Sequence, residues 1–335
     1  MTVRSADTET AAATVDAGER VIQLSRTFQA PPELVWEAFT DPKHVVKWWG
    51  PRGFSTTIEK MDVRPGGEWN LVMKGPDGAL YPNHTVYTEV EKPRLIAYKN
   101  SGRREGGPGA AFHAFITFEP EGAGTRVSLR MVFTSPEARD KVIREFDAVE
   151  GGKSTLERLS EHLSRMAATD RDFVLFRTFD APRERVFEAW TNPKQVAQWW
   201  GPKGFNNPVC EMDVRPGGRY RIVMRSPEGE EYPIVGEFVE IVKPSRIVMT
   251  MDAREHPKEF FDQLDAVRPA SEKGRGFRPL TTVLFDEHFG KTTVTVIQTF
   301  ETPADVDANR KLGAEEGWGQ SFEKLDAELV RGSAA

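Results

Sequence analysis

The sequence predicts an α+β protein built from two copies of one domain. The tetrapeptide Trp-Trp-Gly-Pro occurs at residues 48–51 and again at residues 199–202. The heptapeptide Met-Asp-Val-Arg-Pro-Gly-Gly likewise occurs at residues 61–67 and 212–218. A repeat of about 150 residues has the size of a whole domain and is too long for a solenoid unit. In each copy, hydrophobic patterns with strand and helix periods follow in the order strand, two helices, six strands, long helix.

Composition and charge narrow the class of protein. The length of 335 residues suits two domains, and 39% hydrophobic with 29% charged residues is ordinary for globular proteins. A net charge of −6 offers no basic surface for nucleic acid. Cys210 is the one cysteine, which excludes internal disulfides and a cysteine zinc site and fits a reducing cytoplasm. No run is apolar and long enough for a membrane span. We therefore predict a cytoplasmic protein that binds neither nucleic acid nor membrane.

The repeat also predicts the domain boundaries. Residues 1–18 are rich in Ala, Thr and Asp and are expected to be a disordered tail. The predicted segments that follow are a first domain at 19–166, a linker at 167–172 and a second domain at 173–331. The last few residues, from 331 to 335, are expected to be frayed.

The first elements of each copy are a strand and two short helices. Residues 22–28 place Ile22, Leu24 and Phe28 on one face of a strand. The prolines after this strand suit the start of a helix, where the first N–H has no partner. Apolar residues then recur at helical spacing to Trp49, with a break at Asp41-Pro42 that predicts a kink between two helices.

Six strands and a long helix complete each copy. Alternating apolar and polar residues, separated by turns with Pro and Gly, predict the strands. In the first copy they span about residues 54–63, 68–74, 79–90, 94–98, 112–118 and 127–133. A helix is expected from about residue 136 to residue 163, interrupted at Gly151-Gly152.

The second copy carries an insertion. At residues 254–280 it has about 16 extra residues, a length that a surface loop tolerates. The segment is charged and contains Phe260, Phe261 and Phe277. Because long loops often carry function, we expect a loop that acts as a lid or as a docking surface.

Taken together, the motifs resemble a known family. Arg-Thr-Phe-x-Ala-Pro at residues 26–31 and 177–182, with the two repeated motifs above, is similar to bacterial relatives of the C-terminal domain of the Hsp90 ATPase activator. These AHSA1-like proteins belong to the START-like, Bet v 1-like (SRPBCC) superfamily. The resemblance implies a helix-grip fold, in which a curved antiparallel sheet wraps round a long C-terminal helix with a cavity between them. It implies no defined reaction. The activator's separate N-terminal domain has no counterpart here, so chaperone activation is not carried over.

The inward faces of strands and helix give a candidate ligand pocket in each copy, with an apolar and aromatic lining typical of small-molecule cavities. In the first copy the candidates are Trp69, Leu71, Met73, Ile116, Met131 and Phe146, with Trp36 or Trp49 near the mouth. In the second copy they are Tyr220, Ile222, Met224, Val283, Phe285 and Trp318. The alternative is that these residues only fill a core. The first copy has Gly152 in place of Trp318, which predicts a Trp-sized gap or a different filler.

Three polar residues interrupt these apolar faces. Arg26 and its repeat Arg177 lie between apolar neighbours, so each either anchors a ligand carboxylate or phosphate or forms a structural ion pair. We favour the ion pair because both copies have the arginine. Gln298 takes the place of Met131 in the second copy only, where it either orients a ligand or bonds a backbone group.

No catalytic motif is present. Metalloprotease, nucleophile-elbow and P-loop patterns are absent from the sequence, and no histidine is shared by the two copies. We interpret residues 286–288 (Asp-Glu-His) as a charged turn and Cys210 as a buried, inert thiol. Asp62 and Arg64 are expected to form a surface ion pair worth less than about 1 kcal/mol. Each Trp-Trp pair is expected to have one buried and one partly exposed ring.

The function that these predictions favour is binding of an apolar or aromatic small molecule in a helix-grip cavity, with the second copy as the better candidate. Two alternatives stay open. One is a protein-interaction or chaperone-accessory module with a protein partner. The other is a cyclase- or hydrolase-like enzyme that uses the same cavity. No cofactor, metal or catalytic residue is predicted. The tandem repeat suits a monomer that resembles a dimer, or a homodimer.

Overall fold

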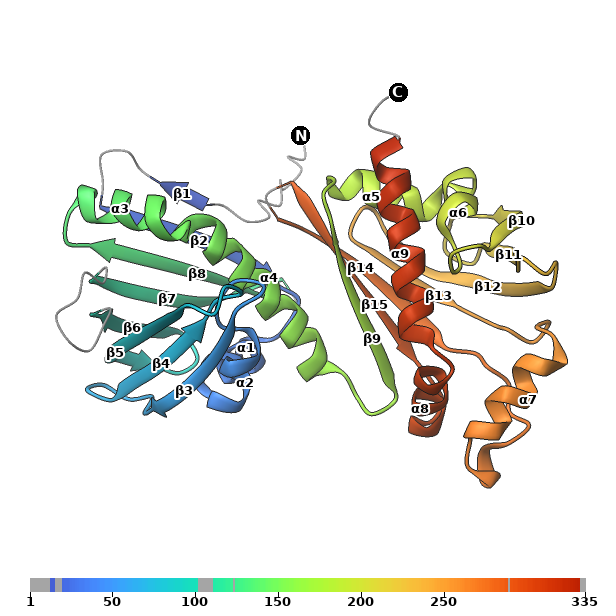
Figure 1. Ribbon diagram of the computed structural model, residues 1–335, viewed down its shortest axis with the longest axis horizontal. Helices are drawn as coiled ribbons and strands as arrows, with labels where there is room; N and C mark the ends of the chain where they lie inside the picture. Colours follow the sequence, from blue (N-terminus) through green and yellow to red (C-terminus); the bar gives the residue numbers. More distant parts are fainter. Residues whose placement is uncertain (1–12, 16–19, 102–110, 123, 289, 332–335) are drawn as a thin grey trace, which may run out of the picture. The chain divides into compact units, whose positions relative to one another are not determined.

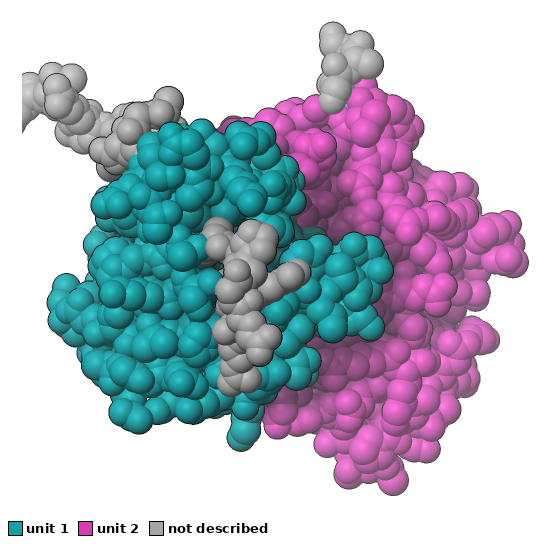
Figure 2. All heavy atoms as spheres, turned by 60° about the vertical axis from the view of Figure 1, so that its left-hand side comes forward, with its two compact units in different colours: residues 1–167 teal, residues 168–335 magenta. Residues whose placement is uncertain are grey.

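The computed structural model describes residues 13–15, 20–101, 111–122, 124–288 and 290–331. The chain divides into two compact units, residues 1–167 (unit one) and 168–335 (unit two), which Figure 2 colours teal and magenta. Each unit contains one antiparallel sheet and a long C-terminal helix that lies across a face of that sheet (Figure 1). The predicted fold class, α+β with two helix-grip domains, is confirmed.

Unit one contains a sheet with the strand order β1-β2-β8-β7-β6-β5-β4-β3. The strands are β1 Ala13–Val15, β2 Val21–Phe28, β3 Ser55–Met61, β4 Glu68–Lys74, β5 Leu80–Glu91, β6 Leu95–Asn100, β7 Phe112–Glu121 and β8 Gly124–Phe133. The helices are α1 Pro32–Thr40, α2 Pro42–Trp48, α3 Pro136–Phe146 and α4 Ala148–Ala167. Consecutive strands from β3 to β8 are neighbours, as expected of chain segments joined by short turns.

Unit two repeats this arrangement with the strand order β10-β11-β12-β13-β14-β15-β9. The strands are β9 Asp172–Phe179, β10 Asn206–Met212, β11 Arg219–Arg225, β12 Glu231–Val242, β13 Arg246–Thr250, β14 Leu280–His288 and β15 Lys291–Thr299. The helices are α5 Arg183–Thr191, α6 Pro193–Trp199, α7 Lys258–Val267, the 3-10 turn η1 Ala270–Glu272, α8 Pro303–Lys311 and α9 Ala314–Arg331.

Three details differ from the expectations. Residues 13–15 form a strand paired with β2, so disorder is wrong there; residues 1–12, 16–18 and 332–335 lie outside the described residues. The long helix of unit one breaks at Asp147, which has a left-handed φ of 47°, and not at the two glycines, which are helical. The insertion is not an open loop, because it contains α7 and η1, and its phenylalanines pack against the core.

The repeated tetrapeptide connects the short helices to the sheet. The indole Nε1 of Trp48 donates a hydrogen bond to the Ala38 carbonyl at 3.0 Å, and Trp199 bonds the Ala189 carbonyl at 2.9 Å. Both rings are fully buried. A buried indole N–H needs such a partner, so the tryptophan fixes one short helix against the other. The glycine that follows has a positive φ, 101° at Gly50, a conformation that glycine adopts without strain.

A cation from the long helix binds the loop that contains this tetrapeptide in both units. In unit one, Nη1 of Arg158 donates to the carbonyls of Gly50 at 2.7 Å and Pro51 at 3.1 Å. In unit two, Nζ of Lys324 donates to the carbonyls of Gly201 at 3.1 Å and Phe205 at 3.2 Å. Burial lowers the pKa of both cations. Their role is therefore to satisfy loop carbonyls and to attach the long helix to the loop.

Candidate functional site

The predicted pocket residues of unit two lie in one continuous core. Tyr220, Ile222, Val283 and Phe285 are buried, and Met224 and Trp318 are partly buried and pack against them. The Tyr220 hydroxyl is used structurally, since it donates to the Thr250 carbonyl at 2.7 Å.

Trp318 is the centre of an aromatic cluster in unit two. Its ring centroid lies 5.6 Å from that of Trp200, 6.2 Å from Trp190 and 5.6 Å from Phe322. Because Trp318 covers Trp200, both rings of the Trp199-Trp200 pair are buried. The expectation of one partly exposed ring is therefore wrong in unit two, whereas in unit one it is confirmed.

A polar pair lies within this core. Thr281 of β14 is opposite Gln298 of β15, and the cross-strand row continues to Met249 on one side and Phe173 on the other. Both outer members belong to the core, so the row faces the interior. Thr281 is 0% exposed and Gln298 3%.

The hydrogen bonding of this pair is incomplete within the protein. The Gln298 Nε2 donates to the Met251 thioether at 3.6 Å, and thioether sulfur is a weak acceptor. The Thr281 Oγ1 has no hydrogen-bond partner among the residues that the structure describes. A buried hydroxyl left without a partner costs about 1–3 kcal/mol. Gln298 was predicted from sequence, whereas Thr281 was missed, although it stands where unit one has Ala114.

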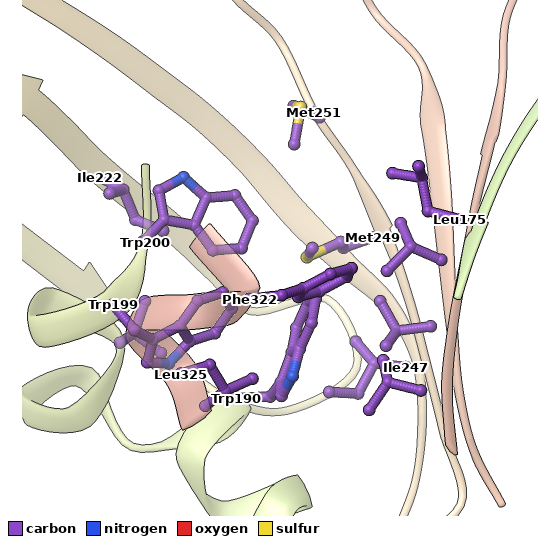
Figure 3. Packing of buried hydrophobic residues seen from close by; sticks show 14 of the residues in the cluster. Leu175, Trp190, Trp199, Trp200, Ile222, Ile247, Met249, Met251, Phe322 and Leu325 are labelled. Atoms are coloured by element: carbon purple, nitrogen blue, oxygen red, sulfur yellow. The ribbon is translucent and has the colours of Figure 1, made fainter. Parts of the chain in front are cut away.

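Figure 3 shows part of the apolar core of unit two, including Met251, the residue that Gln298 contacts. Trp200, Met251 and Leu175 point toward a common centre from different elements of unit two. Met251 connects the two features, since its sulfur contacts Gln298 while its side chain faces this centre. Thioether side chains adapt easily to a change of shape, so this part of the core can rearrange more readily than a core of branched residues.

The hollows described on unit two do not coincide with the predicted pocket. Two hollows lie on unit two, one of about 840 Å³ over β10, β11 and β12 and one of about 910 Å³ beside α5, α6 and the end of α9. Charged residues line much of both. Of the predicted pocket residues in unit two, all of them described, Tyr220 alone borders either hollow. Neither hollow is therefore a ligand cavity at the predicted lining.

In unit one, the equivalent row is apolar except for one phenol. Tyr98, Ala114, Met131 and Ile22 follow one another across β6, β7, β8 and β2. Burial strongly raises the pKa of the Tyr98 phenol, which keeps it neutral.

The remaining predicted lining residues of unit one are mostly in its core. Trp69, Leu71 and Ile116 are buried, and Met73 is partly buried. Phe146 is a correction, because its side chain is 49% exposed. The helix break at Asp147 is the physical reason, since Phe146 is the last residue of α3 and the helical spacing does not continue from it to the core-facing residues of α4.

The predicted gap at Gly152 is filled by a neighbour. A Cβ at this position would lie 2.3 Å from Cδ1 of Leu24, so the leucine occupies the place next to the helix backbone. In unit two, Trp318 covers Trp200, the counterpart of Trp49. In unit one, Trp49 instead packs on Trp69, at a centroid distance of 4.6 Å. Of the two expectations for this position, a different filler is the one observed.

The two repeated arginines differ in their surroundings. Arg177 forms an ion pair with Asp326 of α9, which is the structural pairing favoured from sequence. Arg26 is 2% exposed, and its guanidinium carbon lies 5.3 Å from the centroid of the Phe28 ring. Ser160 stands where unit two has Asp326, so the same carboxylate is not available to Arg26.

Other predictions can be compared directly with the structure. The Asp62–Arg64 surface ion pair is confirmed, with a separation of 2.9 Å. The thiol of Cys210 is partly buried, and burial raises its pKa to about 11, which agrees with an inert cysteine. Residues 286–288 are not a turn, because they are the last residues of strand β14. Nε2 of His288 lies 2.9 Å from a carboxylate oxygen of Asp286 on the same face of the strand.

The chemistry open to the polar pair is recognition and not proton transfer. A threonine hydroxyl and a glutamine amide donate and accept hydrogen bonds, but neither titrates near neutral pH. Together with the surrounding aromatic rings and thioethers, they suit a molecule with an apolar body and one or two polar groups.

The fold and the repeated packing define a tandem helix-grip protein. The sequence profile described as "Activator of Hsp90 ATPase homolog 1-like protein" matches residues 29–164 and 180–330, so the chain belongs to this family. No match was found among curated proteins. Within the described residues, no helix is both long and apolar enough to span a membrane.

Solved structures of similar bacterial proteins each match about half of the chain. A protein from Arthrobacter aurescens is 26% identical, with a TM-score of 0.43, and the match covers 46% of this chain and 91% of that one. A protein from Mycobacterium smegmatis is 25% identical, with a TM-score of 0.43 and coverage of 47% and 97%. The AHSA1 protein from Silicibacter pomeroyi is 25% identical, with a TM-score of 0.36 and coverage of 48% and 97%.

Proposed function

We propose that unit two binds a small molecule that has an apolar or aromatic body and at least one hydrogen-bonding group. The observation that carries the proposal is the buried Thr281 hydroxyl, without a partner in the described structure, beside the Gln298 amide. A ligand that bonds both groups would relieve a polar burial that costs about 1–3 kcal/mol.

The apolar body of the ligand would lie against Trp200 and Met251. Neither described hollow reaches Thr281 or Gln298, so we expect side chains to move when a ligand binds. Met251 is suited to this because its thioether chain has several rotatable bonds. Occupation would also displace the weak contact between Met251 and Gln298, which frees the amide for the ligand. Binding, with no reaction, is what the non-titrating polar pair supports.

The test compares co-purified small molecules in the wild-type chain and in two variants. Thr281→Val removes the hydroxyl at nearly constant shape, and Gln298→Met installs the residue that unit one has at the same place. We expect denaturing extraction and mass spectrometry to find about one bound molecule per wild-type chain. Each variant should weaken binding about 2- to 10-fold, the loss of one hydrogen bond.

Stability gives the matched control for this experiment. Thr281→Val should leave the free protein as stable as before or more so, because it removes a buried hydroxyl that has no partner. Met131→Leu in unit one should change neither binding nor the amount extracted. The proposal fails if the wild-type extract is empty and 8-anilinonaphthalene-1-sulfonate also binds the wild type and Thr281→Val equally.

A further inference from the structure

Two histidines from distant parts of unit one meet beside two carboxylates. Nδ1 of His44 in α2 lies 3.0 Å from Nε2 of His162 in α4. Their ring centroids are 5.1 Å apart, and the planes are tilted by 52°. Nε2 of His44 lies 3.6 Å from a carboxylate oxygen of Glu37. Ligand atoms of Glu37, Asp41 and His44 all lie within 4.8 Å of one another.

We propose that His44 and His162 bind a divalent transition-metal cation in unit one through Nδ1 and Nε2 respectively, with water completing its coordination. This site lies in the other unit from the proposed small-molecule site and does not depend on it. The chemistry selects a cation of the zinc class, because imidazole nitrogen suits zinc, nickel and copper better than magnesium or calcium.

The distance between the two ring nitrogens suits such a cation. Zinc binds imidazole nitrogen at about 2.0–2.1 Å, and a tetrahedral angle then separates two nitrogen ligands by about 3.3 Å. The observed 3.0 Å requires a shift of a few tenths of an ångström.

Glu37 has a separate part in this arrangement. Because it faces Nε2 of His44, it can hold the proton on that nitrogen and leave Nδ1 free to bind the cation. Carboxylates placed in this way fix the tautomer and orientation of a metal-binding histidine. His44 is 27% and Glu37 56% exposed at the side chain, so a cation from solvent can reach the pair.

His162 is held firmly in place, because its residue is only 8% exposed. The residue next to the pair on the same helix, Leu163, is buried in the core, which anchors this part of α4.

Unit two is a natural control. Gln195 stands at the place of His44, and Glu328 stands at the place of His162. Both border the hollow of about 910 Å³ beside α5 and α6, so the place itself exists in unit two without the histidines. A glutamine at this position is compatible with the fold, which makes His44→Gln a conservative test.

The experiment is a calorimetric titration of zinc chloride into the tag-free, chelator-treated chain. We expect one zinc ion per chain. His44→Gln and His162→Gln should each weaken zinc binding by about 100-fold or more, and Glu37→Gln by about 10- to 100-fold. His113→Gln, on β7 and bonded to Thr88, should leave it unchanged. Circular dichroism and thermal unfolding in chelator check that each variant folds.

The visible absorption of bound cobalt is a second measurement, and it does not depend on folding alone. Co²⁺ bound by the two imidazoles should give a visible absorption band, which zinc abolishes by displacing it. We expect this band in the wild type and in His113→Gln but not in His162→Gln. If the histidines serve only as a hydrogen bond between α2 and α4, His162→Gln will alter stability in chelator while the wild type binds no zinc. That result, or zinc binding that His44→Gln and His162→Gln leave unchanged, overturns the proposal.

Discussion

The interiors of the two units differ most clearly at one position of the long helix. Unit one has Gly152, and Leu24 lies against the helix backbone there. Unit two has Trp318, which covers Trp200 and packs on Trp190 and Phe322. The equivalent space between helix and sheet is therefore filled by Leu24 from the sheet in unit one and by Trp318 from the helix in unit two. The size of the residue at this helix position decides which side chain fills the space there, because interiors are close-packed.

The polar residues of the two units have diverged in a related way. Unit two has the Thr281–Gln298 pair inside the core, where unit one has Ala114 and Met131. Unit one has the histidine pair between α2 and α4, where unit two has Gln195 and Glu328. Buried polar groups cost stability unless they are bonded, so these positions are where the two units differ most in polar chemistry.

The largest expected effect concerns the filler of unit two. Trp318→Gly should reduce the free energy of unfolding of unit two by about 3–5 kcal/mol, because it removes a large ring from an aromatic cluster and adds a helical glycine. Pulse proteolysis in urea, with fragments assigned to each unit, measures the change. Trp318→Phe is the control and should retain most of the stability. A loss below about 1 kcal/mol would mean that Trp318 is only a surface cover.

An intermediate effect concerns the insertion, which unit one lacks. His256 lies between Tyr232, at a centroid distance of 5.5 Å, and Phe260, at 4.7 Å. Burial lowers its pKa from 6.5 to about 4. Between pH 4 and pH 6.5 the unfolded segment therefore binds more protons than the folded one. The contribution of neutral His256 to the stability of the insertion is full above about pH 6.5 and is lost as the pH falls toward 4.

The loss should be less than about 3 kcal/mol, the upper bound set by that pKa difference. Hydrogen-exchange protection of α7, corrected for the intrinsic rate at each pH, is the measurement. His256→Phe should keep α7 protected at pH 5. Equal pH dependence in the wild type and in His256→Phe would show that another group controls the insertion.

The smallest expected effect tests the filler of unit one. Gly152→Ala places a methyl group against the buried Leu24, so we expect a loss of about 1–3 kcal/mol in unit one. Gly319→Ala in α9 is the matched control, since no atom lies within 4 Å of the added Cβ, and it should stabilise unit two by up to about 1 kcal/mol. In a Leu24→Ala background the cost of Gly152→Ala should shrink, as contacting residues are not additive. Additive costs would place the strain elsewhere.

Local patterns in the sequence determined the fold. The repeat showed two domains, alternation and helical spacing predicted the order of the elements, and the inward faces containing Trp69 and Tyr220 are inward in the structure. The motifs also identified the family. These properties could be predicted because the side-chain period of a strand or helix involves only residues that are a few positions apart in the sequence.

Tertiary structure alone decided which distant side chains meet. His44 and His162 are 118 positions apart, and nothing in either local pattern brings them together. Thr281 resembled any other strand threonine until its register placed it opposite Gln298. Phe146 was assigned inward because its spacing is helical, but a left-handed residue after it ended the helix. Contacts of this kind depend on strand register, helix breaks and the size of fillers such as Trp318, which only the packed chain determines.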